Sequence, residues 1–170
     1  MARKYQKGEH VCYGMSGVCL IEDVREMTVA KGKDTFYVLR PLQDRHSTFY
    51  IPANNALLTE KMREPVARQK IDALLEAARA DNGEWIIDRK TRMETFREIL
   101  RKADPLEVLR LYALLYRQKQ TLSESGKRLA PSDENVLRQA EDLTKNEFGF
   151  SMQIQSDDAA QYIAEKLNER

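Results

Sequence analysis

The first third of the chain alternates hydrophobic and polar residues with the two-residue period of half-buried β-strands. β-Branched and aromatic residues are frequent here, and glycines or polar clusters interrupt them. Lys31-Gly32-Lys33-Asp34 predicts a hairpin turn, because glycine accepts a positive φ. Four or five strands are expected, at 11–13, 18–29 (one long strand or a bent pair), 35–42 and 47–51. This pattern predicts a small antiparallel barrel or a curled sheet.

After Pro52 the hydrophobic residues recur with the 3.6-residue period of amphipathic helices. Asp81-Asn82-Gly83 is expected to end one helix and cap the next, which places Trp85 on the first helical turn. About five helices are expected, at 66–80, 84–102, 105–120, 134–148 and from 156 onward. The chain is therefore predicted to be an α+β protein, with a β domain at residues 1–60 and a compact helical domain at 61–170.

The overall charge is nearly neutral, but its distribution is uneven. The 28 Lys and Arg and 27 Asp and Glu give a net charge of +1. Residues 61–130 hold 16 basic and 11 acidic residues, whereas residues 131–170 hold 4 and 9. A strongly basic whole protein is excluded. No hydrophobic run reaches the roughly 18 residues of a membrane span and no signal peptide is evident, so a cytoplasmic protein without membrane contact is expected.

Residues suited to catalysis are scarce. The chain has two histidines and two cysteines, and His10 with Cys12 lacks the second pair that a zinc site requires. Residues 14–17 lack the lysine and the spacing of a phosphate-binding loop, so they predict a turn. The sequence therefore predicts a protein that is not an enzyme and has no metal or other cofactor.

The single tryptophan, Trp85, lies beside the basic middle segment. Its position at the edge of the predicted hydrophobic helix face allows two interpretations. It is either a half-buried residue that seals two helices, or an apolar wedge that contacts DNA while nearby cations bind phosphates.

The order of these features resembles the CarD/CdnL regulators of bacterial transcription, whose first module also occurs in transcription-repair coupling factors. The resemblance extends over nearly the whole chain, and no single motif decides it. The matching segments are Tyr5 to Val18, Phe36-Tyr37-Val38-Leu39, Tyr50-Ile51-Pro52 with Asn55, Trp85 with Arg89-Lys90, Asp104-Pro105, and Leu122 to Ala140.

The resemblance implies a Tudor/SH3-like β-barrel that binds the β subunit of RNA polymerase by adding an edge strand to one of its sheets. Met27 and Tyr50 stand where many members have arginine, which suggests a more apolar contact. The residues expected to bind polymerase are Met27, Thr28, Val29, Thr48, Phe49, Tyr50, Ile51 and Pro52.

The resemblance also implies that the helical domain contacts promoter DNA at the upstream edge of the transcription bubble, with Trp85 in the minor groove, and so stabilises the open complex. Ile87 and Asp88 replace arginines of many members, so the phosphate contacts are expected to shift. The expected DNA-binding residues are Trp85, Arg89, Lys90, Arg92 and Arg97. DNA binding is expected to be weak and not sequence-specific, and the protein to be a monomer. The alternative is a non-enzymatic adapter in which the helices are a scaffold and Trp85 is buried.

Overall fold

The computed structural model of the chain describes residues 4–168 and divides into two compact units. The boundary falls between Pro65 and Val66. The sequence placed it at residue 60, before a short strand at Met62–Arg63 that pairs with the N-terminal sheet. The α+β class, with a sheet followed by helices, is confirmed.

The N-terminal unit is built on one antiparallel sheet in the order β4-β3-β2-β1-β5. Its strands are β1 (His10–Tyr13), β2 (Val18–Val29), β3 (Gly32–Pro41), β4 (Phe49–Pro52) and β5 (Met62–Arg63). A 3-10 turn, η1 (Gly14–Ser16), joins β1 to β2, and a one-turn helix, α1 (Ala56–Thr59), follows β4. The expected barrel is not closed, so β4 and β5 are edge strands.

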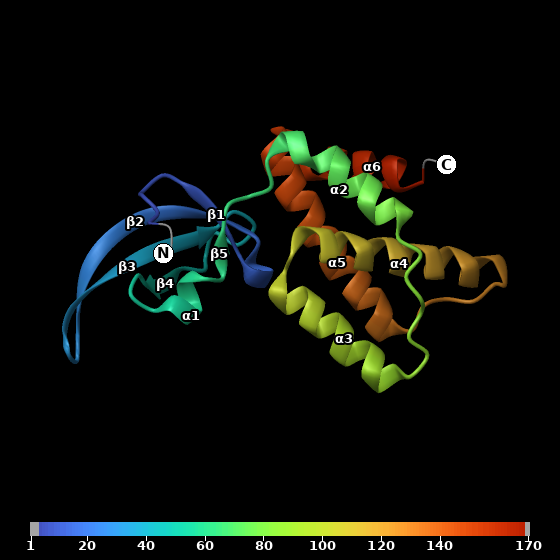
Figure 1. Ribbon diagram of the computed structural model, residues 1–170, viewed down its shortest axis with the longest axis horizontal. Helices are drawn as coiled ribbons and strands as arrows, with labels where there is room; N and C mark the ends of the chain where they lie inside the picture. Colours follow the sequence, from blue (N-terminus) through green and yellow to red (C-terminus); the bar gives the residue numbers. More distant parts are fainter. Residues whose placement is uncertain (1–3, 169–170) are drawn as a thin grey trace. The chain divides into compact units, whose positions relative to one another are not determined.

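β2 and β3 form a long, curved hairpin (Figure 1). Gly32, with a φ of +124°, lies at its turn. The register shifts between Ile21 and Asp23, which leaves Glu22 as the extra residue of a bulge. Such a bulge bends and twists a strand, which explains why one continuous strand occupies the segment that the sequence predicted as either one long strand or a bent pair.

The concave core of this unit is formed by side chains that alternate along the strands. They are Val11, Cys19, Ile21, Tyr37, Leu39, Ile51 and Met62. On β4 the alternation buries Ile51 and leaves Tyr50 exposed. The position of each β4 side chain follows from this two-residue period.

The second unit consists of five helices in its described residues. They are α2 (Arg68–Ala80), α3 (Arg89–Lys102), α4 (Pro105–Glu124), α5 (Pro131–Met152) and α6 (Ser156–Leu167). α2, α4, α5 and α6 pack on one another, and α3 packs against α4 and α5 (Figure 1). Their shared core includes Leu75, Phe96, Leu109, Leu115 and Phe148.

Several helix boundaries differ from the sequence-based expectation, and two of the differences have a clear local cause. α3 begins at Arg89 and not at residue 84, because the Asp88 carboxylate accepts the Thr91 N–H at 2.9 Å and caps the helix there. α5 continues through Gly149, which was expected to stop it. A Cβ at Gly149 would lie 3.2 Å from the Ile154 carbonyl oxygen, so this glycine permits close packing of the turn after α5.

Candidate functional site

The first candidate surface is the free edge of β4. Ala53 N–H donates to the Thr35 carbonyl at 2.9 Å, and the ladder pairs Val38 with Tyr50. Because hydrogen-bonded and non-hydrogen-bonded pairs alternate in an antiparallel ladder, the N–H and C=O of Tyr50 point away from β3. Pro52 has the same outward orientation and has no N–H to offer, as is usual at an edge. Tyr50 is thus the residue in β4 with both main-chain groups available to another strand.

The side chains of β4 divide between the core and the surface. Tyr50 is 48% exposed, whereas Ile51 is 4% exposed and belongs to the core. Phe49 packs against Tyr13 with 6.1 Å between ring centroids. Ile51 therefore presents neither its side chain nor its main chain at this edge, which argues against its predicted contact with polymerase. It holds β4 onto β3.

The other predicted polymerase segment, Met27, Thr28 and Val29, does not neighbour β4. These residues pair with Asp34, Lys33 and Gly32 near the hairpin turn, and β3 lies between them and β4. Tyr50 is level with Asp23 across the sheet, four residues from Met27, or about 13 Å along the strand. The two predicted polymerase segments therefore lie on strands that are not neighbours in the sheet. Thr48 and Pro52, at the two sides of Tyr50, are partly exposed.

The second candidate surface is the non-helical segment 81–88 with the start of α3. Trp85 is in this segment and not on a helical turn. Its ring packs edge-to-face against Phe96, with centroids 6.0 Å apart, and the Arg92 guanidinium lies 4.9 Å from the ring centroid. Trp85 is partly buried at the margin of the helical core. The residue remains partly exposed, so both interpretations of Trp85 stay open.

Arg92 is a structural residue. Its side chain is 8% exposed, and its Nε and Nη2 donate to the Asp133 carboxylate at 3.0 and 3.1 Å. Its Nη1 donates to the carbonyl oxygens of Ile86 and Ile87 at 3.0 and 3.1 Å. Every nitrogen of the guanidinium already donates a hydrogen bond, which argues against the predicted phosphate contact by Arg92. The residue instead fixes the segment that contains Trp85.

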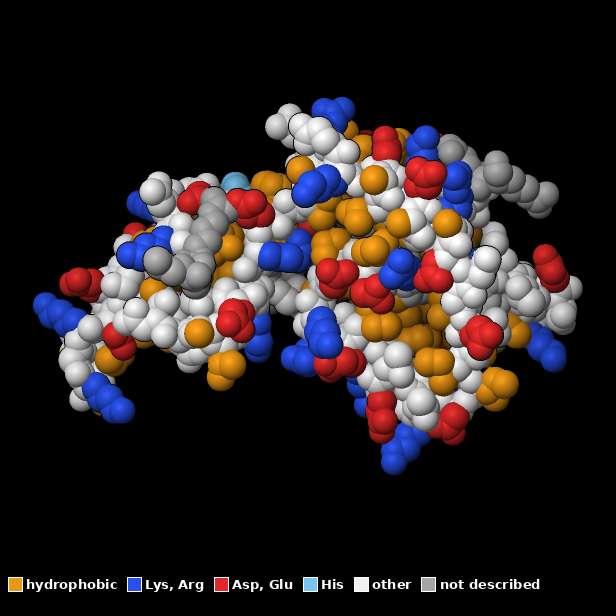
Figure 2. Space-filling model, viewed as in Figure 1, with side chains coloured by type: hydrophobic (Ala, Val, Ile, Leu, Met, Phe, Trp, Pro, Cys, Tyr) orange, Lys and Arg blue, Asp and Glu red, His pale blue; other side chains and the backbone are white. Residues whose placement is uncertain are grey.

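The other three predicted DNA-binding cations are exposed. Arg89, Lys90 and Arg97 lie on α3, and within the described residues none of them forms an ion pair. Acidic and basic side chains are interspersed on the face shown in Figure 2, without one large basic patch.

Two residues at the start of α3 were not assigned from the sequence. Ile87 is 88% exposed. The Asp88 carboxylate accepts hydrogen bonds from the Thr91 hydroxyl and N–H, and these bonds lower the pKa of Asp88 below its ordinary value. The spacing of Asp88 and Thr91 is a capping signal that the stronger turn signal of Asn82-Gly83 outweighed.

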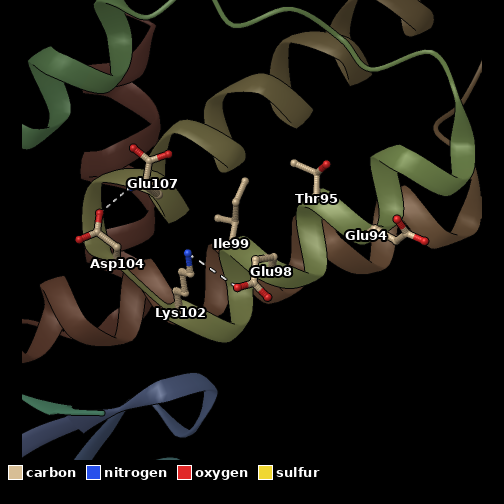
Figure 3. A pocket seen from close by; sticks show the side chains of 7 residues that line it. All are labelled: Glu94, Thr95, Glu98, Ile99, Lys102, Asp104 and Glu107. Carbon is tan, nitrogen blue, oxygen red and sulfur yellow. Dashed lines mark hydrogen bonds and ion pairs between the residues drawn. The ribbon is translucent and has the colours of Figure 1, made fainter. Parts of the chain in front are cut away.

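A cavity of about 460 Å³ lies between the end of α3 and the start of α4 (Figure 3). Four of its seven lining residues are acidic, but three of these carboxylates already have partners. Glu98 pairs with Arg101 and Lys102. Asp104 caps α4 by accepting the Glu107 N–H, and Glu107 in turn pairs with Arg110. The arrangement is that of helix capping and surface ion pairs, and it offers no activated base or nucleophile.

The described residues contain no group of three or more His, Cys, Asp or Glu side chains that could hold a metal ion. Burial raises the pKa of Cys19 to about 12, which keeps this thiol protonated and unreactive at neutral pH. No helix in the described part of the chain is long and hydrophobic enough to span a membrane.

Comparison with known families decides the class of the N-terminal unit. Residues 5–65 match the model of the CarD-like/TRCF RID domain, and these residues form the sheet described above. The N-terminal unit is a CarD-like/TRCF RID domain. The resemblance to CarD-like regulators is thereby confirmed for residues 5–65, and this domain supports an RNA polymerase-interacting, transcription-related protein. RID domains are protein-interaction domains and not an enzyme family. Among curated proteins, none matches the chain significantly.

Proposed function

We propose that this protein binds the β subunit of RNA polymerase through the β4 edge of its RID domain and stabilises the open promoter complex through the helical unit. The observation that carries the proposal is the RID domain with a free edge strand, whose Tyr50 N–H and C=O point outward. A strand of the polymerase would pair with this edge, because main-chain hydrogen bonds provide affinity with little dependence on side chains. The protein would act in the bacterial cytoplasm as a monomer.

The helical unit would contact DNA where the duplex meets the melted strands. Arg89, Lys90 and Arg97 would bind phosphates, and the accessible part of the Trp85 ring would lie in the minor groove. Neither contact requires base readout. Since the net charge is only +1, affinity for free DNA would be low, and the tether to polymerase would supply a high effective concentration.

Stabilisation would arise from opposition to bubble collapse. The duplex must rewind at the position that the helical unit occupies, so displacement of these contacts adds to the closing barrier. Each 1.4 kcal/mol added to that barrier would slow collapse about tenfold. A few contacts are therefore enough for a large effect on lifetime.

The packing of Trp85 against Phe96 favours one other candidate, a protein-binding adapter in which the helical unit is a scaffold. This adapter would bind polymerase but leave the promoter complex unchanged.

The test is the lifetime of open complexes formed by purified bacterial RNA polymerase on one promoter at fixed salt concentration. It compares no factor, the wild-type protein and Trp85→Ala. We expect the wild type to lengthen the lifetime and Trp85→Ala to lose most of that effect while it still binds polymerase. A wild type that binds polymerase and leaves the lifetime unchanged would establish the adapter; no binding to polymerase would refute the proposal.

A further inference from the structure

Ile87 is the most exposed of the large hydrophobic side chains in the described residues, with 88% of its surface accessible. A single exposed isoleucine is common on protein surfaces and needs no explanation by itself. Its backbone and its neighbours make this one unusual.

The backbone that carries Ile87 is held by a buried ion pair. Arg92, paired with Asp133, donates from Nη1 to the carbonyl oxygens of both Ile86 and Ile87. The side chain is thus fully solvated while its main chain is anchored to the core. The conformational entropy of ordering this backbone is already lost in the folded protein, so a partner that binds Ile87 does not have to offset it.

The charges next to Ile87 suit an anionic partner. Arg89 and Lys90 are the first two residues of α3, and both are exposed without an ion pair in the described part of the chain. The Asp88 carboxylate lies between them and Ile87, but it is turned toward the helix, where it accepts from Thr91. An apolar side chain followed by two cations at the start of a helix combines a wedge for a base step with donors for the adjacent phosphates.

We infer that Ile87 is a second apolar contact of the DNA wedge, beside the partly buried Trp85. This inference rests on the proposed function. Trp85 is partly buried between Phe96 and Arg92, whereas Ile87 is exposed and has few protein contacts to lose when it enters the minor groove. Isoleucine is among the side chains that minor-groove proteins insert between base steps.

The experiment measures open-complex lifetime and the fluorescence of 2-aminopurine placed at the upstream edge of the bubble, for the full-length protein bound to polymerase. The variants are Ile87→Ala, Ile87→Met and, as a control, Ile154→Ala, which removes the other isoleucine that is substantially exposed (39%) in the helical unit. We expect Ile87→Ala to shorten the lifetime about fivefold relative to wild type and to reduce the 2-aminopurine signal. Ile87→Met should retain both effects because it keeps an apolar wedge, and Ile154→Ala should match wild type.

Thermal unfolding separates this role from a structural one, since Ile87→Ala removes no buried contact and should leave the midpoint unchanged. If wild type prolongs the complex and Ile87→Ala is equal to it, the inference is wrong and the proposed function stands. If Ile87→Ala weakens binding to polymerase without DNA, Ile87 contacts protein and the inference is also wrong. If wild type has no effect on the lifetime, the proposed function itself has failed.

Discussion

The two candidate surfaces present different kinds of groups. The RID domain offers main-chain atoms at the edge of β4, where Tyr50 directs its N–H and C=O outward. The helical unit offers side chains, Trp85 and Ile87, on a segment that the Arg92–Asp133 pair fixes. A main-chain contact at an edge tolerates replacement of side chains, whereas the proposed DNA contact of segment 81–88 depends on particular residues.

The largest expected effect is on the stability of the helical unit, when the ion pair that holds segment 81–88 is removed. Asp133→Ala leaves the Arg92 guanidinium charged, buried and without its carboxylate, and should reduce the free energy of unfolding of the helical unit by about 3 to 5 kcal/mol. Denaturant unfolding followed by the fluorescence of the single tryptophan, Trp85, reports this unit directly.

The matched control is Asp142→Ala on the same helix, which removes an exposed pair with Lys145 and should cost less than about 1 kcal/mol. If the two variants are equally stable, the buried pair does not hold the segment. Polymerase binding by the RID domain should be unchanged in both.

The second largest expected effect is on polymerase binding, when the main chain at the β4 edge is changed. Tyr50→Pro removes the outward N–H and introduces a ring at the interface, and should weaken binding to RNA polymerase about tenfold or more. Tyr50→Ala keeps the N–H and should weaken binding only about threefold or less. Binding can be measured by biolayer interferometry with immobilised polymerase. Equal losses in the two variants would show that the tyrosine side chain, and not the main chain, makes the contact.

The smallest expected effect is a gain in stability from glycine at positions with a positive φ, which should leave function unchanged. Gln153 ends α5 with a φ of +58° and is exposed, so Gln153→Gly should stabilise the helical unit by about 0.5 to 1 kcal/mol. Ala103 has a similar φ of +53°, but its methyl group is buried. Ala103→Gly should therefore gain less, because a small cavity offsets the relief of strain. Neither change should alter open-complex lifetime; a longer lifetime with Gln153→Gly would mean that stability alone controls it.

The elements of the fold were largely predictable because each has a clear period of hydrophobic residues. Closure of the sheet was not, since it depends on the bulge at Glu22 and on the number of strands that can pair. The edge position of β4 followed from family resemblance, but which of its groups face outward required the ladder register. The burial of Ile51 also depends on this register.

The helical site was harder to predict than the edge. Arg92 is a basic residue in a basic segment near Trp85, which is typical of a phosphate-binding residue. Its burial depends on Asp133, which lies 41 positions away in the sequence. The start of α3 was placed too early because Asn82-Gly83 is a strong turn signal, and this error put Trp85 on a helix. The exposure of Ile87 could not be expected until the Asp88 cap fixed that boundary.

The most direct measurement is a titration of open-complex lifetime against protein concentration for wild type, Tyr50→Pro and Trp85→Ala. We expect Tyr50→Pro to raise the half-maximal concentration and reach the wild-type plateau, because polymerase docking alone is weakened. Trp85→Ala should lower the plateau at an unchanged half-maximal concentration, because docking is intact and the DNA contact is lost. If both variants changed the same parameter, docking and stabilisation would not be separate functions of the two units.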